Sequence, residues 1–277
     1  MAVPLPKVIL SVAGSDPSGG AGIQADLKTF AALGVYGAAA ITCLTVQNTL
    51  GVRTFTTVTP ALVRKQIAAV LDDLPVTHVK IGMVGNASLA AAIAEALAAF
   101  SGEVVYDPVL KAGAGQSLLH DDARSALSQL LDRATALTPN LPELAALTGQ
   151  TLTSAPEITA AAGTLFRDHP QLRAVVVTGG HRDEGSELVI DLLCRRAADN
   201  AISTAEHVHP RVQSRNLHGT GCTFAAAFAA CHALTGSYEA AFFEASAFVA
   251  RLIAQSANLP LGHGNGPLHH HLARRIP

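Results

Sequence analysis

Short apolar runs alternate along the chain with longer stretches in which apolar residues recur at helical spacing. The short runs have the length and composition of buried strands, which we expect at residues 8–13, 39–46, 79–84, 104–106, 134–137 and 174–177. The longer stretches predict helices at residues 23–33, 60–74, 88–100, 121–131, 141–147 and 156–169. This alternation predicts an α/β fold with a mostly parallel central sheet and helices on both faces.

The pattern changes in the last third of the chain. Residues 187–212 form shorter alternating runs with charged interruptions, which is typical of an antiparallel extension at the edge of a sheet. Residues 219–234 and 237–255 then predict a helical hairpin that closes the fold. Since no internal repeat or linker interrupts the chain, we expect a single domain spanning residues 1–277.

Composition narrows the class of protein. Hydrophobic residues make up 49% of the 277 positions and charged residues only 14%, which supports a large core and is typical of a compact enzyme. The formal net charge of −2 gives no general attraction to nucleic acids or acidic membranes. The four cysteines show neither zinc nor disulfide spacing. With neither a membrane-spanning apolar stretch nor a signal peptide in the sequence, we expect a cytoplasmic protein.

Polar residues and glycines follow the predicted parallel strands at the points where they end. In open parallel sheets, ligands bind outside the carboxyl ends of the strands. The sequence therefore predicts a small-molecule site along this rim of the sheet. Its candidate contributors are residues 14–16, 47–48, 82–83, 107–108, 138–140 and 178–180.

The segment Gly219-Thr220-Gly221-Cys222 opens the helical hairpin and combines an anion site with a thiol. The first N–H groups of a helix have no partner within it and can hold a phosphate. A cysteine in that field is expected to have a lowered pKa and to be partly thiolate near neutral pH. The turn would then supply both an oxyanion cradle and a base, although a glycine-capped helix with a small buried thiol is the structural alternative.

A glycine-rich loop at residues 14–22 separates the first strand from the first helix. Its end matches the G-x-G-x-x-A pattern of dinucleotide sites, but the acidic residue that such sites place about 20 positions further on is missing. The loop also lacks the Gly-Lys-Ser/Thr ending of a Walker A motif. It is therefore either a place where backbone approaches a small ligand or a simple tight turn.

Asp107 and Glu143 are the candidate metal ligands, because Mg²⁺ is usually held by one or two carboxylates, waters and substrate phosphates. The alternatives are a strand-end cap for Asp107 and a helix N-terminal carboxylate for Glu143. His263 and the three consecutive histidines at 269–271 suggest a second metal site. We disfavour it because no carboxylate or cysteine lies at ligand spacing.

Together these motifs closely resemble the hydroxymethylpyrimidine/phosphomethylpyrimidine kinases of thiamine biosynthesis, which are members of the ribokinase-like superfamily. The resemblance runs nearly end to end. It covers residues 13–29 (AGSDPSGGAGIQADLKT), 46–49 (VQNT), 80–83 (KIGM), 107–109 (DPV), 138–143 (TPNLPE), 179–181 (GGH) and 218–223 (HGTGCT).

The resemblance implies a three-layer αβα ribokinase-like fold, usually assembled as a homodimer. It implies an enzyme that uses ATP to phosphorylate 4-amino-5-hydroxymethyl-2-methylpyrimidine and then its monophosphate, with Mg²⁺ as cofactor. Gln47 would hydrogen-bond the aminopyrimidine ring. The residues that would line or support this pocket are Gly14, Asp26, Met83 and Val109.

The resemblance also implies roles in phosphoryl transfer. Cys222 would be the catalytic base, and the N–H groups of Gly219, Thr220 and Gly221 would form an anion hole with its own. Asp107 and Glu143 would organise Mg²⁺, through waters, against the ATP phosphates. Asn140 and Thr178 would complete the nucleotide site.

Two positions depart from the family pattern near the nucleotide. Thr178 stands where family members generally carry a lysine before the Gly-Gly-His segment. Lys111 follows the Asp-Pro-Val segment where the family commonly has valine. Lys111 could supply the missing cation from a different element, or be an ordinary solvated lysine.

Two other functions compete with this one. Pyridoxal kinases of the same branch share the Gly-Thr-Gly-Cys turn but carry a second cysteine after the Asp-Pro-Val segment, where this chain has Ala112 and Gly113. Because Ala112 and Gly113 have no thiol, this difference favours the pyrimidine over pyridoxal as the substrate. The loss of lysine at Thr178 leaves open a non-catalytic ligand-binding regulator on the same fold. Turnover of ATP with the pyrimidine alcohol would separate the enzyme from the regulator.

Overall fold

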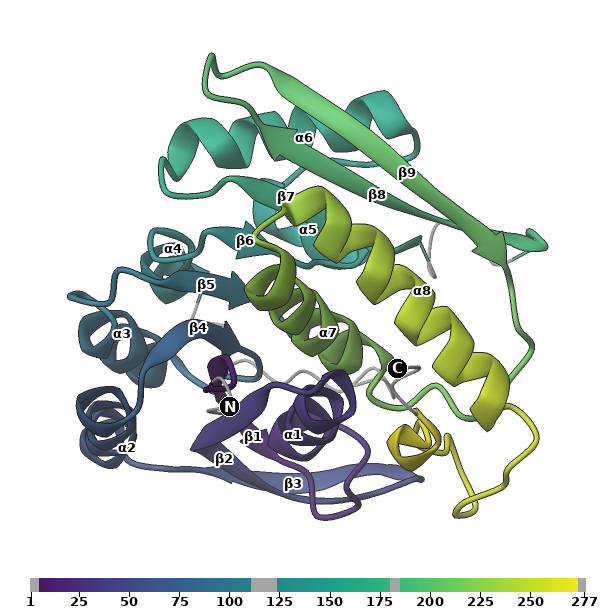
Figure 1. The fold of residues 1–277 in the computed structure, drawn as a ribbon, viewed down its shortest axis with the longest axis horizontal. Coiled ribbons are helices and arrows are strands. Elements are labelled where there is room, and N and C mark those ends of the chain that lie inside the picture. Colours follow the sequence, from purple (N-terminus) through teal and green to yellow (C-terminus); the bar gives the residue numbers. More distant parts are fainter. Residues whose placement is uncertain (1–4, 111–123, 180–184, 274–277) are drawn as a thin grey trace.

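The computed structural model describes residues 5–110, 124–179 and 185–273, and one nine-stranded sheet runs through them (Figure 1). The strand order is β3-β2-β1-β4-β5-β6-β7-β8-β9. Neighbours from β2 through β7 pair in parallel, whereas β3, β8 and β9 are antiparallel additions at the two edges. The strands are β1 Val8–Ser15, β2 Tyr36–Asn48, β3 Gly51–Thr57, β4 Val76–Ile81, β5 Glu103–Tyr106, β6 Ala136–Leu137, β7 Ala174–Val177, β8 Leu188–Arg196 and β9 Ile202–Pro210.

Helices cover both faces of the sheet and make the three layers that the sequence predicts. One face packs against α1 Gly22–Leu33, α7 Thr220–Thr235 and α8 Tyr238–Ser256. The other packs against α2 Pro60–Asp73, α3 Ala87–Ala96, α4 Arg124–Leu131, α5 Leu141–Thr148 and α6 Ala155–Asp168. Near the C-terminus, residues His270–Leu272 form a short 3₁₀ helix. None of the described helices is long and apolar enough to cross a membrane.

The expected strands and helices are confirmed, with small shifts at their ends. The strand expected at 79–84 is β4, which begins at Val76 and ends at Ile81, and the helix expected at 88–100 ends at Ala96. The first residues of the helix expected at 121–131 lie outside the described part of the chain. Strand β3 was not predicted, because its threonines and Arg53 give no apolar run. It forms by pairing antiparallel with β2.

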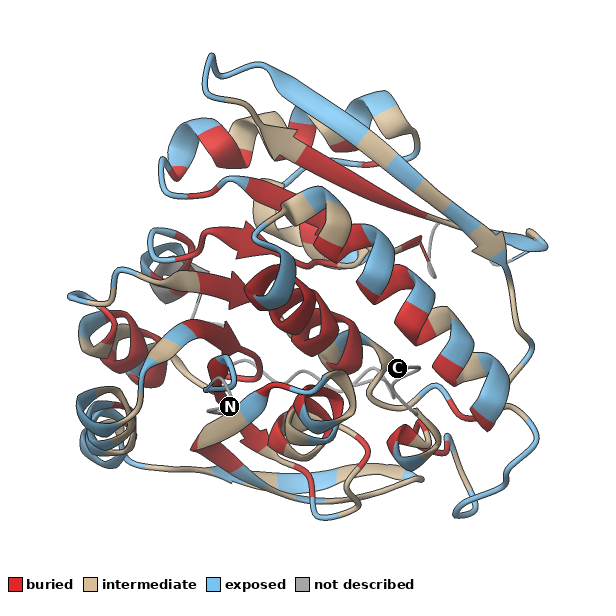
Figure 2. Cartoon of the chain, viewed as in Figure 1, coloured by how far each residue is buried: buried red, intermediate tan, exposed pale blue. Residues whose placement is uncertain are grey.

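The most deeply buried part of the molecule is the centre of the sheet together with α7 (Figure 2). Helix α7 packs against α1, α8 and the sheet, so it is buried on nearly every side except at its ends. Its alanines allow these close approaches, while Phe224 and Phe228 fill the remaining space. Because α7 is fixed on several sides, its N-terminus is held at a defined place at the rim of the sheet.

Candidate active site

A cavity of about 1550 Å³ opens along the carboxyl ends of the parallel strands. It is lined by loops that follow the parallel strands and by the first turn of α7. Every described residue to which the family resemblance assigned a role in the site lines this cavity, except Asp26. These residues are Gly14, Gln47, Met83, Asp107, Val109, Asn140, Glu143, Thr178, Gly219, Thr220, Gly221 and Cys222. Of the other strand-end candidates, Asn48, Gly82, Pro108, Pro139 and Gly179 are not among the residues that line it. Lys111 lies outside the described residues.

The start of α7 is formed by close backbone packing between two glycine-rich segments. Gly219, the N-cap residue, has a left-handed backbone with φ of 81°, and a Cβ there would overlap the carbonyl oxygen of Gly20. Gly22 is similarly left-handed, and a Cβ on it would overlap the carbonyl oxygen of Gly14. Gly219 has no side chain to cap α7, and the Thr220 N–H donates a 3.3 Å hydrogen bond to the Leu217 carbonyl. The N–H groups of Gly221 and Cys222 stay open to an anion in the cavity.

The thiol of Cys222 differs from the sequence-based expectation. Burial raises its pKa to about 12, and the negative charges of Asp107 and Asp26 act in the same direction. The ammonium of Lys80 and a hydrogen bond donated by the Gly22 N–H lower the pKa, but by less. The residue keeps some exposure to the cavity, yet protein atoms surround the sulfur closely. The prediction of a partly ionised thiol is therefore wrong for the chain without ligands.

This shift predicts how Cys222 reacts with an alkylating reagent. Labelling by iodoacetamide, followed by peptide mass spectrometry, is expected to accelerate about tenfold per pH unit from about pH 7 to about pH 10, because the thiolate fraction rises in that proportion below the pKa. Cys43, Cys194 and Cys231 are buried and serve as internal controls that label only after denaturation. A rate that levels off below about pH 8 would contradict the raised pKa.

A buried ion network lies close to the thiol. The Lys80 ammonium on β4 lies 3.0 and 3.1 Å from the two carboxylate oxygens of Asp26 on α1 and 3.8 Å from Oδ2 of Asp107. The Ser11 hydroxyl donates a 2.6 Å hydrogen bond to Asp26. Asp26 is fully buried and does not line the cavity, so it can only support the pocket wall indirectly, through the residues that it contacts. Sequence reasoning gave Lys80 no role, although a lysine within a buried strand was a usable signal.

Asp107 and Glu143 form a carboxylate pair at the cavity wall. Burial raises the pKa of Asp107 to about 6 and that of Glu143 to about 8, and the charge of Asp107 adds to the shift of Glu143. Glu143 also completes a capping box at α5, in which its carboxylate accepts from the Asn140 N–H and its own N–H donates to the Asn140 side chain. The alternative role considered for Glu143, as a carboxylate at a helix N-terminus, is thus confirmed.

The Asp107–Glu143 pair also has the features expected of a site that binds a cation. Oδ2 of Asp107 is buried and has no hydrogen-bond partner among the described residues. Two neighbouring carboxylates that are both made harder to ionise are stabilised when a cation lies against them. Their oxygen ligands are those that a hard cation such as Mg²⁺ prefers.

Gln47 belongs to a polar cluster in which the sequence named Asp16 only as one of the strand-end candidates and gave His218 and Ser18 no role. The His218 Nε2–H donates to Oδ2 of Asp16 at 2.8 Å, and the Gln47 amide lies 3.1 Å from the same nitrogen. The Asp16 carboxylate also accepts from the Ser18 hydroxyl and from the N–H groups of Ser18, Gly20 and Ala21. Although burial alone would raise its pKa, the hydrogen bonds from His218 and Ser18 lower it to about 2.

The remaining predicted residues lie in two places on the cavity wall. Met83 lies beside Gly14, where an added Cβ would come 3.1 Å from the Met83 sulfur. Thr178 pairs with Asn140 through a backbone bridge between the two chain segments. Next to it, the Gly179 N–H donates a 2.8 Å hydrogen bond to the carboxylate of Asp191 on β8. The cavity thus extends from the glycine-rich loop to the antiparallel edge of the sheet.

Comparisons with known proteins agree with this geometry. The family model for phosphomethylpyrimidine kinase matches residues 16–269. The hydroxymethylpyrimidine/phosphomethylpyrimidine kinase of Rhizobium meliloti is 43% identical, over 95% of this chain and 96% of its own length. The protein of the same name from Bacillus subtilis is 41% identical, over 96% and 95%. The structure of pyridoxal kinase from Staphylococcus aureus in complex with AMP-PCP superimposes with a TM-score of 0.85 at 31% identity, over 99% of this chain and 96% of the other.

Proposed function

We propose that this chain, which belongs to the phosphomethylpyrimidine kinase family, is the ATP-dependent kinase that phosphorylates 4-amino-5-hydroxymethyl-2-methylpyrimidine and then its monophosphate in thiamine biosynthesis. The observation that carries this proposal is that one cavity contains the open N-terminus of α7, the Asp107–Glu143 pair and the Gln47 cluster. Because residues from near both ends of the chain line that cavity, we infer that residues 1–277 act as one catalytic unit.

Phosphoryl transfer depends mainly on positioning and on the stabilisation of charge. We assign the N–H groups of Gly219, Thr220, Gly221 and Cys222 to an anion hole for the transferred phosphoryl group. The Thr220 N–H would exchange its 3.3 Å hydrogen bond to the Leu217 carbonyl for one to the phosphoryl group. Cys222 is the group that accepts the proton of the substrate hydroxyl. Its raised pKa means that this role depends on charge balance when ligands bind.

The cation site fits the same scheme. Asp107 and Glu143 would hold Mg²⁺, partly through waters. When bound there, Mg²⁺ would balance the charge of the ATP phosphates and oppose the effect of Asp107 on the Cys222 thiol. Asn140 and Thr178 border the same part of the cavity and are assigned to the nucleotide.

For the pyrimidine, Gln47 supplies the polar contact and the backbone at Gly14 allows the ring to approach closely. Met83 and Val109 provide apolar wall. Asp26 supports this wall through Lys80 and does not touch the ligand. His218 and Asp16 border the Gln47 amide from the adjoining loops.

A substrate panel tests the proposal. ADP release would be measured with the pyrimidine alcohol, with its monophosphate and with pyridoxal, and each product would be identified by mass spectrometry. We expect turnover with both pyrimidines. Turnover with pyridoxal alone would favour the rival that the Staphylococcus aureus likeness supports. Binding of the pyrimidine without ADP release would instead support a regulator.

Replacing Gln47 by leucine is expected to raise the KM for the pyrimidine alcohol about tenfold or more, with little change in the KM for ATP. A site built to hydrogen-bond a ring loses affinity when a buried polar partner is left unpaired. Steady-state kinetics with each substrate varied in turn provides the measurement. Gln66→Leu is the matched control, because the Gln66 amide bonds only to the backbone of Ile41 among the described contacts. Equal changes in both KM values would make Gln47 structural.

We further propose that the protein works as a cytoplasmic homodimer, as the family resemblance implies. Cytoplasmic location is supported by the need for ATP. Leu44 and Val46 lie two residues apart on β2 and are exposed, which makes this surface a candidate interface. Light scattering should give twice the monomer mass of 28.5 kDa, and a monomer at micromolar concentration would contradict the proposal.

A further inference from the structure

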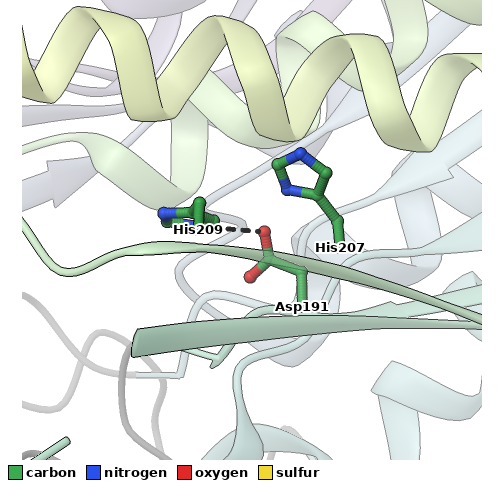
Figure 3. Close-up of side chains that lie close together, drawn as sticks. All are labelled: Asp191, His207 and His209. Carbon is green, nitrogen blue, oxygen red and sulfur yellow. Dashed lines mark ion pairs between the residues drawn. The ribbon is translucent and has the colours of Figure 1, made fainter. Parts of the chain in front are cut away.

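Three potential metal ligands lie together on the antiparallel edge of the sheet (Figure 3). Asp191 on β8 pairs directly with His207 on β9, and His209 follows two residues later. Because side chains alternate along a strand, all three project from the same face of the β8–β9 pair. That face is covered by α8, where the ring of His207 lies 6.4 Å from Phe242 and 5.9 Å from Phe243.

The spacing of the three side chains suits a small cation. Each offers one ligand atom, and these atoms all lie within 4.8 Å of one another. Oδ2 of Asp191 lies 3.7 Å from Nε2 of His209, which is too long for a good hydrogen bond. Two ligand atoms on a tetrahedral Zn²⁺ are separated by about 3.4 Å. A metal ion would therefore fit between Asp191 and His209 after a shift of a few tenths of an ångström. The ligand atom of His207 lies within 4.8 Å of theirs, so it would move by about 1.4 Å at most.

Neighbouring backbone groups orient two of the three side chains. Oδ1 of Asp191 accepts a 2.8 Å hydrogen bond from the Gly179 N–H, which leaves Oδ2 directed at the histidines. With Nδ1 of His209 donating to the Pro210 carbonyl at 3.2 Å, its Nε2 lone pair faces the carboxylate. Ligating histidines and carboxylates in metal sites are held by contacts of this kind.

The presence of His207 distinguishes this cluster from a simple ion pair between Asp191 and His209. A protonated His209 beside Asp191 would account for those two groups, and the Asp191 carboxylate does raise the pKa of His209. Nδ1 of His207, however, is buried without a hydrogen-bond partner among the described residues. A bound metal ion would satisfy all three residues at once.

We propose that Asp191, His207 and His209 form a binding site for a divalent transition-metal ion such as Zn²⁺. Two imidazoles and one carboxylate suit Zn²⁺, Co²⁺ or Ni²⁺ better than Mg²⁺, so this site is distinct in chemistry from the Asp107–Glu143 pair. It is the one group of three such ligands within residues 5–110, 124–179 and 185–273. Asp191 and His209 line the cavity, so a fourth coordination position is open to water or to a ligand.

Zn²⁺ itself is the probe for the test. The metal-free full-length protein would be titrated with Zn²⁺ near neutral pH by isothermal calorimetry, alongside His207→Gln and His209→Gln. We expect one binding event in the wild type that is weakened at least about tenfold in each variant. His263→Gln and His271→Gln are matched controls, because these histidines are outside the cluster, and they should leave the event unchanged.

Two further measurements test whether the variants are folded and where Zn²⁺ binds. Circular dichroism in EDTA checks that each variant is folded, and glutamine keeps the polarity and approximate size of the histidine it replaces. Anomalous diffraction from crystals soaked in Zn²⁺ should show a peak between Asp191, His207 and His209. Equal Zn²⁺ affinity in the wild type and in both cluster variants would overturn the proposal. An anomalous peak at the Cys222 thiol or at His271, with none at the cluster, would overturn it as well.

Discussion

Replacing Lys80 by methionine is expected to lower the free energy of unfolding by about 3–5 kcal/mol, because it leaves buried carboxylates without their cation. Lys80 and Asp26 are both fully buried, and the ammonium contacts both oxygens of Asp26. Methionine fills a similar volume, so the loss would come from charge and not from a cavity. Urea unfolding followed by circular dichroism gives the measurement.

The exposed pair Arg64–Glu95 provides the matched control. These side chains keep 43% and 71% of their surface exposed, and the pair spans 3.3 Å. Arg64→Met is therefore expected to cost only about 0–1 kcal/mol. If both substitutions cost the same, the buried network would contribute nothing beyond an ordinary surface ion pair.

The loss in Lys80→Met should also depend on pH. Burial is the largest influence on the Lys80 pKa and lowers it, but the charges of Asp26, Cys222 and Asp107 and the hydrogen bond to Asp26 together raise the pKa above its usual value. The stabilising contribution of Lys80 is therefore fully present throughout the neutral range. In the variant, burial raises the Asp26 pKa without an opposing cation, and the folded state binds more protons than the unfolded state. Stability then falls as pH rises, so the deficit should be smaller at about pH 5 than at about pH 8. A deficit that is constant between these values would contradict this account.

Cys222→Ser is expected to lower turnover by roughly 10² or more while leaving nucleotide affinity nearly unchanged. A serine hydroxyl is a much weaker acid than a thiol, so it cannot supply the proton acceptor, whereas the α7 N–H groups remain in place. The measurements are kcat with the pyrimidine alcohol and the Kd of a nonhydrolysable ATP analogue.

Cys231→Ser makes the same chemical change in the same helix and serves as the control. Cys231 is buried three helical turns away from the start of α7 and does not line the cavity, so kcat should stay near that of the wild type. If Cys222→Ser had wild-type turnover, Cys222 would not be the base. The anion hole would then be the only catalytic contribution of this turn.

The sequence predicted those parts of the molecule that depend on local pattern. Strand β7 is apolar over its whole length and β1 is apolar apart from Ser11 and its last two residues, so their positions could be inferred directly. The edge strand β3 could not, because its pattern is polar and its order comes from pairing with β2. The strand ends also placed Asp107, Glu143 and Gln47 correctly on one cavity, since parallel strands end at one rim.

What local pattern could not supply was the set of neighbours brought by the fold. The helix start at Cys222 suggested a lowered pKa, but Asp26 and Asp107 come from distant segments and reverse the direction. His218 meets Asp16 only because the last loop before α7 packs on the first loop of the sheet. The Asp191–His207–His209 cluster likewise required the register of β8 against β9, which the alternating pattern alone does not fix.

The position of α7 over the central strands has a consequence for synthesis on the ribosome. Strands β1, β4 and β5 are complete once Tyr106 has been made, but α7 and α8 end only at Ser256, about 150 residues later. At about 5–20 residues per second, the nascent chain would expose one apolar face of this sheet for roughly 8–30 s. During that interval Ile9 and Val105 have no covering helix from α7 or α8. Emerging chains would therefore be expected to need a chaperone before residues 219–222 have even been synthesised.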